Sequence, residues 1–437
     1  MIIVSYGIGI VIFVMFAKIL NIIYNNPAII RGSLFSLFSF VNQGIGFILL
    51  ILLANYIQPT EYGMLSMFNT FTQLLTFFIA FSAAGYVSVS YFSKDFVEFR
   101  RDFSSIMILG VISILLIVPI IIFFSSNIVD ILGIPNLYIW ISVIICITQF
   151  LHNINLDIIR IQEKVSKYGI YSCGFAILNF MLSIIFVIGY HLSWNGRVYA
   201  QLVIAIVFGL IAIFQFYQQN LLTTRINTNQ LKSIALWGLP LIPHLTSNWI
   251  KQGCDRLIIN DAYSMEEVGI FSFALNLVSI ITMVGYAFNQ VNSIEIYKTL
   301  GDRENNNDWK KKKLRQQRRS ILLIYVFAFI IITIACLLGV PILLPKYSMS
   351  VVYFIPLSLY GFGVCLYLLY CNFLFYYGEN KKIMMITFSS SLFHLLLSLL
   401  LTRYSLLYTA IIYVVMQLYI VLLVRRYANQ ILQTELI

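Results

Sequence analysis

The chain has 437 residues, of which 60% are hydrophobic and 10% charged, and its mean hydropathy is +0.89. Soluble domains hold about 45–50% apolar and about 25% charged residues, so this composition excludes a water-soluble globular protein and indicates one embedded in lipid. The net charge of +11 would suggest nucleic-acid binding in a soluble protein, but the positive-inside rule and anionic lipids explain it here, and no nucleic-acid partner is expected.

Twelve stretches are apolar over about the twenty residues that a membrane-spanning helix needs. They lie at 33–57, 64–92, 103–124, 137–157, 168–190, 196–218, 234–260, 267–294, 320–344, 350–374, 383–402 and 405–424. The predicted fold is therefore all-α, a polytopic membrane protein. A further apolar segment at 2–23 is interpreted as an extra helix outside this core; a thirteenth span, an interfacial helix and an extension upstream of the true start are its alternatives.

Basic residues indicate the orientation of the spans. Most of the 28 Lys and Arg residues fall before the first span and in every second gap after it, including the run Lys298–Arg319. The other side keeps only Arg197, Lys346 and Arg403. This asymmetry predicts that the basic gaps, and with them the C-terminus, are cytoplasmic.

One short pattern occurs twice. Glu61-Tyr-Gly63 with Ser66 follows the first span and Glu267-Val-Gly269 with Ser272 follows the seventh, an offset of 206 residues from Gly63 to Gly269. Since six spans fill one period, the two halves run in the same direction through the membrane, a parallel repeat found in some transporters. The predicted organisation is an extra segment at 1–31, a six-helix lobe at 32–218, a polar linker at 219–231 and a second six-helix lobe at 232–437.

Nothing in the sequence predicts catalysis or a cofactor. The gaps leave no room for a soluble domain, and the G-x-x-x-x-G-K-[ST] and G-x-S-x-G motifs are absent. The six cysteines form no C-x-x-C pair and the four histidines are far apart, so neither a disulfide framework nor a metal site is expected. His394 in particular has no charged neighbour in sequence and is interpreted as a packing residue.

The seventh span carries the most informative polar residues. Gly238, Pro240 and Pro243 open it and are expected to break or bend the helix. A net-basic stripe follows on one helical face, with an arginine at its outer end: His244, Asn248, Lys251, Asp255 and Arg256. Charges at membrane depth cost about 2.5–3.5 kcal/mol each, so the stripe is typical of the wall of a path for an anion. The alternative is an i,i+4 ion pair between Lys251 and Asp255 that neutralises itself.

Two other spans hold polar candidates. The fourth span has a polar face at its cytoplasmic end, formed by Gln149, Asn153, Asp157 and Arg160. A functional role and simple solvation at the membrane interface are equally good explanations of this face. Asp157 and Arg160 are expected to form an ion pair. Asn42 and Gln43 in the first span are candidates for the cavity wall, although interhelical hydrogen bonds are the default for neutral polar residues, as for Asn69 and Gln73 in the second.

Two stretches resemble the polysaccharide (O-antigen repeat-unit) flippases of the multidrug/oligosaccharidyl-lipid/polysaccharide exporter superfamily. One runs from Gly32-Ser-Leu-Phe to Leu53-Ala-Asn-Tyr-Ile-Gln-Pro-Thr-Glu-Tyr-Gly63, the other from Gly238-Leu-Pro-Leu-Ile-Pro-His244 to Asp255-Arg256-Leu-Ile-Ile-Asn260. The resemblance covers about residues 30–425. It implies two lobes that form a V and rock between inward-open and outward-open states, often driven by an ion gradient.

The resemblance also implies a cargo and a location. The cargo would be an undecaprenyl-pyrophosphate-linked oligosaccharide, moved from the cytoplasmic to the periplasmic leaflet of a bacterial inner membrane through a cationic cavity. Membrane lipids, a polysaccharide polymerase and a chain-length regulator would be its partners. The sequence departs from the pattern at 2–23 and at Ile45, which occupies the position equivalent to Lys251, so cavity charge is expected mainly from the C-terminal lobe.

Two rival functions remain. A cation-coupled multidrug exporter of the same superfamily requires an acidic, aromatic cavity, and the spans hold few acidic residues. A membrane O-antigen polymerase normally has a long periplasmic loop, which the predicted topology lacks. The sequence alone therefore favours a non-enzymatic flippase.

Overall fold

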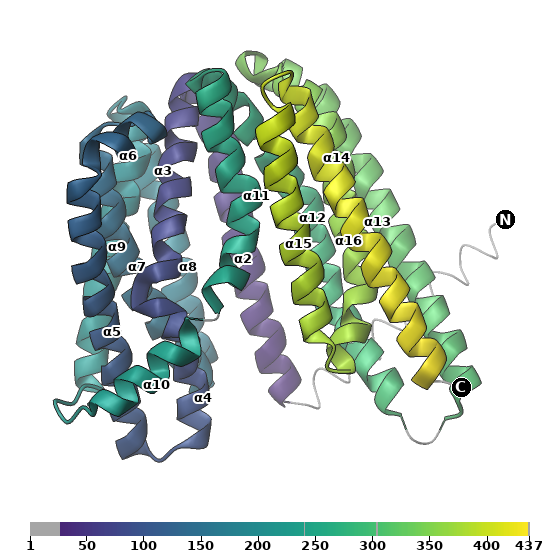
Figure 1. Ribbon diagram of the computed structural model, residues 1–437, viewed down its shortest axis with the longest axis horizontal. Helices are drawn as coiled ribbons and strands as arrows, with labels where there is room; N and C mark the ends of the chain where they lie inside the picture. Colours follow the sequence, from purple (N-terminus) through teal and green to yellow (C-terminus); the bar gives the residue numbers. More distant parts are fainter. Residues whose placement is uncertain (1–26, 240, 303–304, 436–437) are drawn as a thin grey trace.

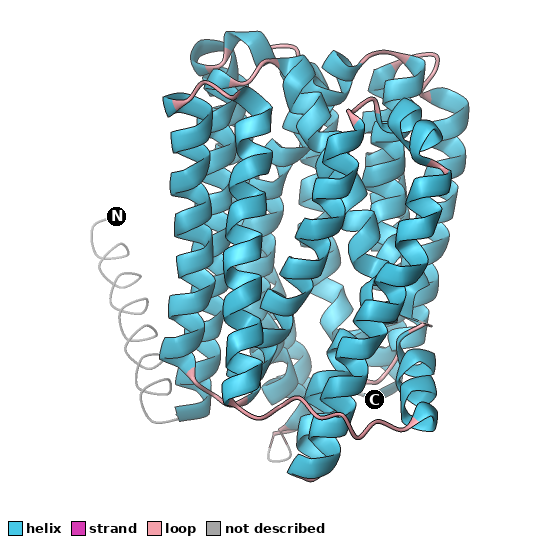
Figure 2. Ribbon diagram, turned by 90° about the vertical axis from the view of Figure 1, so that its left-hand side faces the viewer, coloured by secondary structure: helices cyan, strands magenta, loops and turns pink. Residues whose placement is uncertain are grey.

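The computed structural model describes residues 27–239, 241–302 and 305–435, and every regular element in these ranges is a helix (Figure 2). The predicted extra helix at 2–23 lies outside the described residues. The first lobe contains α2 (Pro27–Tyr56), α3 (Pro59–Phe78), η1 (Ile79–Gly85), α4 (Tyr86–Ser93), α5 (Phe96–Phe123), α6 (Ser125–Leu132), α7 (Asn136–Ile161), α8 (Val165–Ile184), η2 (Ile185–Gly189) and α9 (Ser193–Gln218). After α10 (Thr228–Gly238), the second contains α11 (Leu241–Ala262), α12 (Met265–Gly301), α13 (Asn307–Leu343), η3 (Pro345–Tyr347), α14 (Ser350–Tyr376), α15 (Asn380–Leu401) and α16 (Leu406–Glu435).

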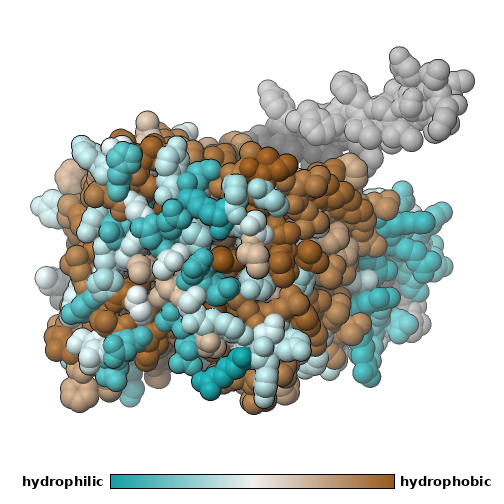
Figure 3. Space-filling view, turned by 90° about the horizontal axis from the view of Figure 1, so that it is seen from above, coloured by the Kyte–Doolittle hydropathy of each residue, from teal (hydrophilic) through white to brown (hydrophobic). Residues whose placement is uncertain are grey.

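The polytopic all-α fold predicted from the sequence is confirmed. Ten helical stretches in the described chain are long and apolar enough to cross a membrane. The other two predicted spans hold α2, whose stretch Phe40–Tyr56 is apolar but shorter, and α11, which carries Lys251, Asp255 and Arg256. All twelve predicted intervals are thus helical, while the number of spans stays a prediction. Much of the rim in Figure 3 is hydrophobic, apart from a hydrophilic area at the right. Many helices expose large apolar side chains, among them Leu323, Phe327 and Leu338 of α13.

The predicted seventh span, 234–260, is two helices. α10 ends at Gly238 and α11 begins at Leu241, which confirms a break where Gly238 and Pro240 were expected to cause one. Pro243 lies in the first turn of α11, where a missing N–H costs nothing. The predicted linker boundary at 231 therefore falls inside α10, and this helix runs across the lower end of the first lobe in Figure 1.

α10 is held by the first lobe. The side chain of Gln230 donates a hydrogen bond to the buried carboxylate of Asp102, which also accepts from Ser90 at 2.5 Å and pairs with Lys94 at 2.7 Å. The ring of Trp237 packs edge-on against Tyr86, with centroids 5.3 Å apart. The linker helix therefore belongs structurally to the first lobe, and the chain changes lobe between Gly238 and Leu241.

The predicted second span, 64–92, is interrupted. Ala80, Phe81 and Ser82 in η1 all have left-handed backbone conformations, with φ of 50°, 51° and 58°. Each costs about 1–2 kcal/mol for an L-residue. The Ser113 hydroxyl accepts from the Ala80 N–H at 3.0 Å, and Gly238 lies so close that a Cβ there would be 2.3 Å from the Phe81 carbonyl oxygen. α10 and α5 together hold this bend.

The lobes come together most closely at the upper end of the view in Figure 1, and below it α11 stays in contact with α3, where the Trp249 indole N–H donates to the Thr70 carbonyl at 2.9 Å. We call the lower end in this view, where α4 meets α5 and α12 meets α13, the basic end, and the upper one the opposite end. At the opposite end the Lys346 ammonium donates to the Asn55 carbonyl at 2.7 Å, and the Tyr347 hydroxyl donates to the Ile57 carbonyl at 2.9 Å. Asn276 also donates to the Tyr62 hydroxyl at 2.7 Å. The V is therefore closed at the opposite end and open towards the basic end.

The two copies of the repeated sequence pattern meet in this contact. A Cβ on Gly63 would lie 2.0 Å from the carbonyl oxygen of Met265, and one on Gly269 would lie 1.8 Å from that of Pro59. Only glycine lets the backbones of α3 and α12 approach so closely. The glycines recur at one offset because each copy supplies one half of the same nearly symmetric interface.

We predict that Gly269→Ala lowers the free energy of unfolding by about 1–3 kcal/mol, the usual cost of overpacking, because its methyl group meets backbone that cannot move aside. Gly339→Ala in α13 is the control. Nothing lies within 4 Å of its Cβ position, and alanine in a helix interior is favoured over glycine by about 1 kcal/mol. Unfolding of the purified proteins checks both, and superimposable curves for Gly269→Ala and the wild type would contradict the contact.

Candidate functional site: a cationic cavity between the lobes

Three adjoining hollows form the space between the lobes. The C-lobe hollow, about 920 Å³, is lined mainly by α11, α12, α14 and α15 and contains Lys251. The outer hollow, about 220 Å³, lies between α2, α3 and α11, with Arg197 of α9 on its wall. The N-lobe hollow, about 360 Å³, lies between α2, α7 and α8. Gln73 and Gln252 line both the C-lobe hollow and the outer hollow, and Arg197 lines both the outer hollow and the N-lobe hollow. The three hollows therefore lie next to one another along the space between the lobes.

The C-lobe hollow combines amines with tyrosine rings. Lys251 projects from the middle of α11 and is 7% exposed, while Lys381 is exposed at the start of α15, at the basic end. No ion pair joins Lys251 to any residue that the structure describes. Tyr286, Tyr360 and Tyr367 line the same wall. Aromatic faces and hydroxyls suit sugar rings, and the unpaired ammonium suits an anion.

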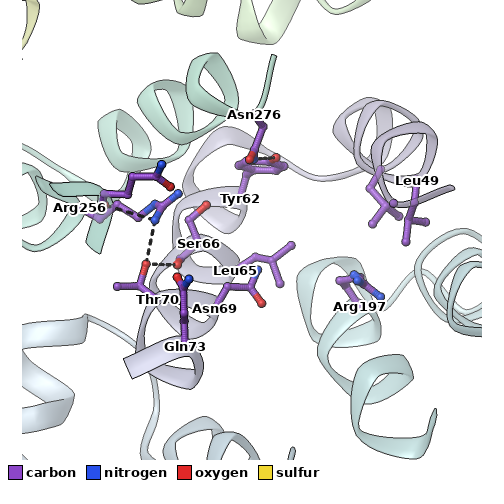
Figure 4. A pocket seen from close by; sticks show the side chains of 13 residues that line it. Leu49, Tyr62, Leu65, Ser66, Asn69, Thr70, Gln73, Arg197, Arg256 and Asn276 are labelled. Atoms are coloured by element: carbon purple, nitrogen blue, oxygen red, sulfur yellow. Dashed lines mark hydrogen bonds between the residues drawn. The ribbon is translucent and has the colours of Figure 1, made fainter. Parts of the chain in front are cut away.

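The outer hollow holds two arginines from opposite lobes (Figure 4). Arg256 of α11 donates from Nε to the Ser272 hydroxyl at 3.0 Å and from Nη1 to the Thr70 hydroxyl at 3.2 Å. Arg197 of α9 donates from Nη1 to the Asn179 side-chain oxygen at 2.7 Å and to the Ser183 hydroxyl at 2.8 Å. Because all these partners are neutral, both guanidinium charges remain available to an anion in the hollow.

The position of Arg197 adds a cavity residue that the sequence analysis did not propose. Its place near a predicted span boundary assigned it to the side away from the basic gaps, and cavity charge was expected mainly from the C-terminal lobe. The structure places it inside α9, half-buried and directed into the cavity. A single residue near a helix end does not reveal whether it points to solvent or inward, so the linear sequence held no signal for this.

Asp255 has a different partner from the one considered in the sequence analysis. Its carboxylate is fully buried and accepts from the Ser398 hydroxyl at 2.6 Å, and its other oxygen lies 2.8 Å from Nε2 of His394. The i,i+4 pair with Lys251 is not formed. The interpretation of His394 as a packing residue without a charged partner was wrong, because α15 carries it against α11 from 139 residues away.

The remaining candidates of the seventh span cannot be placed. His244 and Asn248 belong to α11, but their side chains lie outside what the structure describes. Their contribution to the cavity stays a prediction.

The candidates of the first and fourth spans divide between the cavity and other surroundings. Asn42, Gln149 and Asn153 line the N-lobe hollow, and Asn42 also donates to the Ser172 hydroxyl. Asp157 and Arg160 form the expected pair at 2.9 Å, at the basic end of α7.

Gln43 is exposed and lines none of the three hollows. By contrast, Asn69 and Gln73, for which interhelical hydrogen bonds were the default, lie on the wall of the outer hollow. Within the described residues, no group of three or more His, Cys, Asp or Glu side chains is arranged to hold a metal ion. The path is instead built from cations, amides and hydroxyls.

Comparisons with known proteins identify relatives of this architecture. The polysaccharide biosynthesis protein family matches residues 31–292, more than half of the chain. "Lsg locus putative protein 1" of Haemophilus influenzae is 22% identical over 356 residues, 77% of this chain and 82% of that protein. An "uncharacterized membrane protein" of the same species is 23% identical over 362 residues, 80% of this chain and 84% of that one.

Solved structures share the fold. The lipid II flippase MurJ, in an inward closed conformation, has a TM-score of 0.70 at 15% identity, covering 92% of this chain and 90% of MurJ. A multidrug resistance MATE family transporter of the MOP superfamily, in an inward-facing conformation, has a TM-score of 0.68 at 13% identity, covering 94% of this chain and all of that one. With the sequence match over more than half of its length, this chain belongs to the polysaccharide biosynthesis protein family of multi-pass membrane proteins.

Proposed function

We propose that the protein is a flippase that moves an undecaprenyl-pyrophosphate-linked oligosaccharide, an O-antigen or related repeat unit, from the cytoplasmic to the periplasmic leaflet of a bacterial inner membrane. The observation that carries the proposal is the set of cations without carboxylate partners along the path between the lobes: Lys251, Arg256 and Arg197. A diphosphate is the densest anion in such a cargo, and neutral partners leave these charges free to bind it. The family match to polysaccharide biosynthesis supports the choice of cargo.

The contacts between the lobes support alternating access. The distribution of basic residues supports a cytoplasmic location for the basic end and for the C-terminus. The described state is then open to the cytoplasm, with Lys381 at the mouth and Lys251 deeper in the path. Release on the periplasmic side requires the contact between Gly63 and Gly269 to separate and the basic ends to close. Arg197 and Arg256 sit just below that contact, where an anion drawn through the cavity arrives before release.

The rival exporter of cationic drugs is disfavoured by the same charges. A cationic drug would meet two arginines and a lysine in the cavity, while the only buried carboxylate on α11, Asp255, is covered by His394 and Ser398. A polysaccharide polymerase and a chain-length regulator remain proposed partners, since polymerisation must follow the delivery of such units.

Arg197→Gln and Arg256→Gln are each expected to slow the appearance of lipid-linked units at the periplasmic face by about tenfold or more, since a hydrogen bond to a charged group is worth about 1.5–3 kcal/mol. The Lys251→Ala, Arg256→Ala double variant should be slower still. The measurement is the accumulation of undecaprenyl-pyrophosphate-linked oligosaccharide, sorted by membrane leaflet.

Arg403→Gln provides the matched control, because Arg403 is exposed at the opposite end and pairs with Asp261 at 2.9 Å, away from the cavity. It should flip at the wild-type rate at equal protein abundance. Normal delivery by the double variant would refute the cationic mechanism. Units that cross but stay unpolymerised in a deletion strain would point to a polymerase, and no accumulation at all to drug export.

The pair of Asp255 and His394 supports coupling to protons. Both side chains are fully buried, and their contact joins a carboxylate to an imidazole, two groups that can exchange a proton. Ser398 on α15 and Tyr413 on α16, whose ring centroid is 4.6 Å from that of His394, contact the pair. On α11 itself, Cys254 and Arg256 are the sequence neighbours of Asp255, and Lys251 lies one turn away. Gain or loss of a proton here changes the packing of α11 against α15, and α11 carries two of the three cavity cations.

Asp255→Asn, which keeps the shape of the side chain and removes its charge, is expected to abolish stimulation of flipping by a pH gradient in proteoliposomes. Binding of the lipid-linked cargo should stay within about twofold, because the pair faces away from the hollows. Asp261→Asn, on the same helix but exposed, is the control and should respond like the wild type. Stimulation of the wild type by a sodium gradient and not by a pH gradient would exclude this role of the pair.

A further inference from the structure

A second basic site lies outside the cavity, on the C-terminal lobe. α13 has 37 residues, about 55 Å of helix, whereas about twenty residues suffice to cross a bilayer. Its apolar run begins at Ile321, so the turns from Asn307 to Ser320 project beyond the hydrocarbon at the basic end. There α13 packs beside the last turns of α16 and the end of α14, and a pocket of about 270 Å³ opens between them.

The pocket presents three cations on one helical face. Lys311, Arg315 and Arg318 are spaced by four and three residues, and all three line it. Among the described residues none of them has an ion-pair partner, and no carboxylate lines the pocket. Asn429 and Gln433 of α16 provide amide groups on the facing side, and Leu314, Phe373 and Leu432 provide apolar surface.

A fourth cation is held close by an aromatic ring. The guanidinium of Arg318 lies 5.3 Å from the centroid of Tyr370, and that of Arg425, from α16, lies 5.9 Å from the same ring. The ring fixes the orientation of both groups through cation–π contacts. Like charges gathered by packing repel each other unless an anion lies between them, so the fold prepares this place for one.

We infer that this pocket is a binding site for a phosphate group, supplied by an acidic phospholipid of the cytoplasmic leaflet. Arg318 stands three residues before the apolar run, at the depth of the headgroups. The apolar floor of Leu314 and Phe373 accommodates glycerol and the first methylenes beside the phosphate. The site is separate from the cavity, shares no lining residue with it, and does not depend on which cargo the protein moves.

The test compares two variants that remove equal charge from one helix. Arg315→Gln/Arg318→Gln removes two lining cations, and Lys312→Gln/Arg319→Gln removes two exposed cations that do not line the pocket. Binding of phosphatidylglycerol and phosphatidylcholine to the purified full-length proteins is measured by native mass spectrometry, with and without inorganic phosphate. Equal unfolding temperatures verify that the variants are folded, and single Arg315→Gln replaces the pocket variant if that one is unstable.

We expect the affinity for phosphatidylglycerol to fall about tenfold or more in the pocket variant and less than twofold in the control, with phosphatidylcholine weak throughout. If millimolar phosphate displaced the lipid from the wild type and the control but not from the pocket variant, the pocket would be a phosphate site for a soluble ligand and not for a lipid. An equal loss of lipid affinity in both variants would mean that the basic helix attracts anionic lipid without a specific site. Unchanged lipid affinity in both variants would exclude the site.

Discussion

The close approach of α3 and α12 is the contact on which the rest of the structure depends. Glycine at positions 63 and 269 removes the side chains that would hold the two backbones apart, and the lobes then lock together at one end. From this interface the helices of the two lobes diverge towards the basic end, where the cavity has its mouth. The interface also divides the internal repeat between the lobes, with one glycine from each copy at the same close approach.

Charge inside the molecule is arranged in two distinct ways. Asp255 is neutralised locally by His394 and Ser398, whereas Lys251, Arg256 and Arg197 are oriented by neutral groups or left without a partner. In a low-dielectric interior an unpaired cation is costly, and in the proposed function an anionic cargo provides the missing partner when it occupies the cavity. The same argument, applied at the headgroup level, separates the pocket of Arg315 and Arg318 from an ordinary basic surface.

The connection between the lobes separates rigid parts from the place where they can pivot. α10 is anchored to the first lobe through Asp102 and Trp237, and its terminal Gly238 presses on the left-handed bend at Phe81. α11 is bonded to α15 through Asp255, and it also reaches the first lobe, where Trp249 and Arg256 donate to Thr70 of α3. In the proposed rocking of the lobes, the natural hinge is the junction of α10 and α11, because Pro240 between them has no N–H to donate to a continuous helix.

The sequence by itself determined the class of the protein, the helical intervals, the break near Pro240, the repeat and the basic stripe of the seventh span. These features depend on composition and local periodicity, and the bilayer imposes strong constraints on both. Only the tertiary structure decided that His394 meets Asp255, that Arg197 points into the cavity, and that Gly63 and Gly269 touch backbone of the other lobe. These contacts depend on which helices become neighbours and on how each helix is rotated about its axis. The hydropathy pattern carries little information on either, because most faces of every helix are apolar.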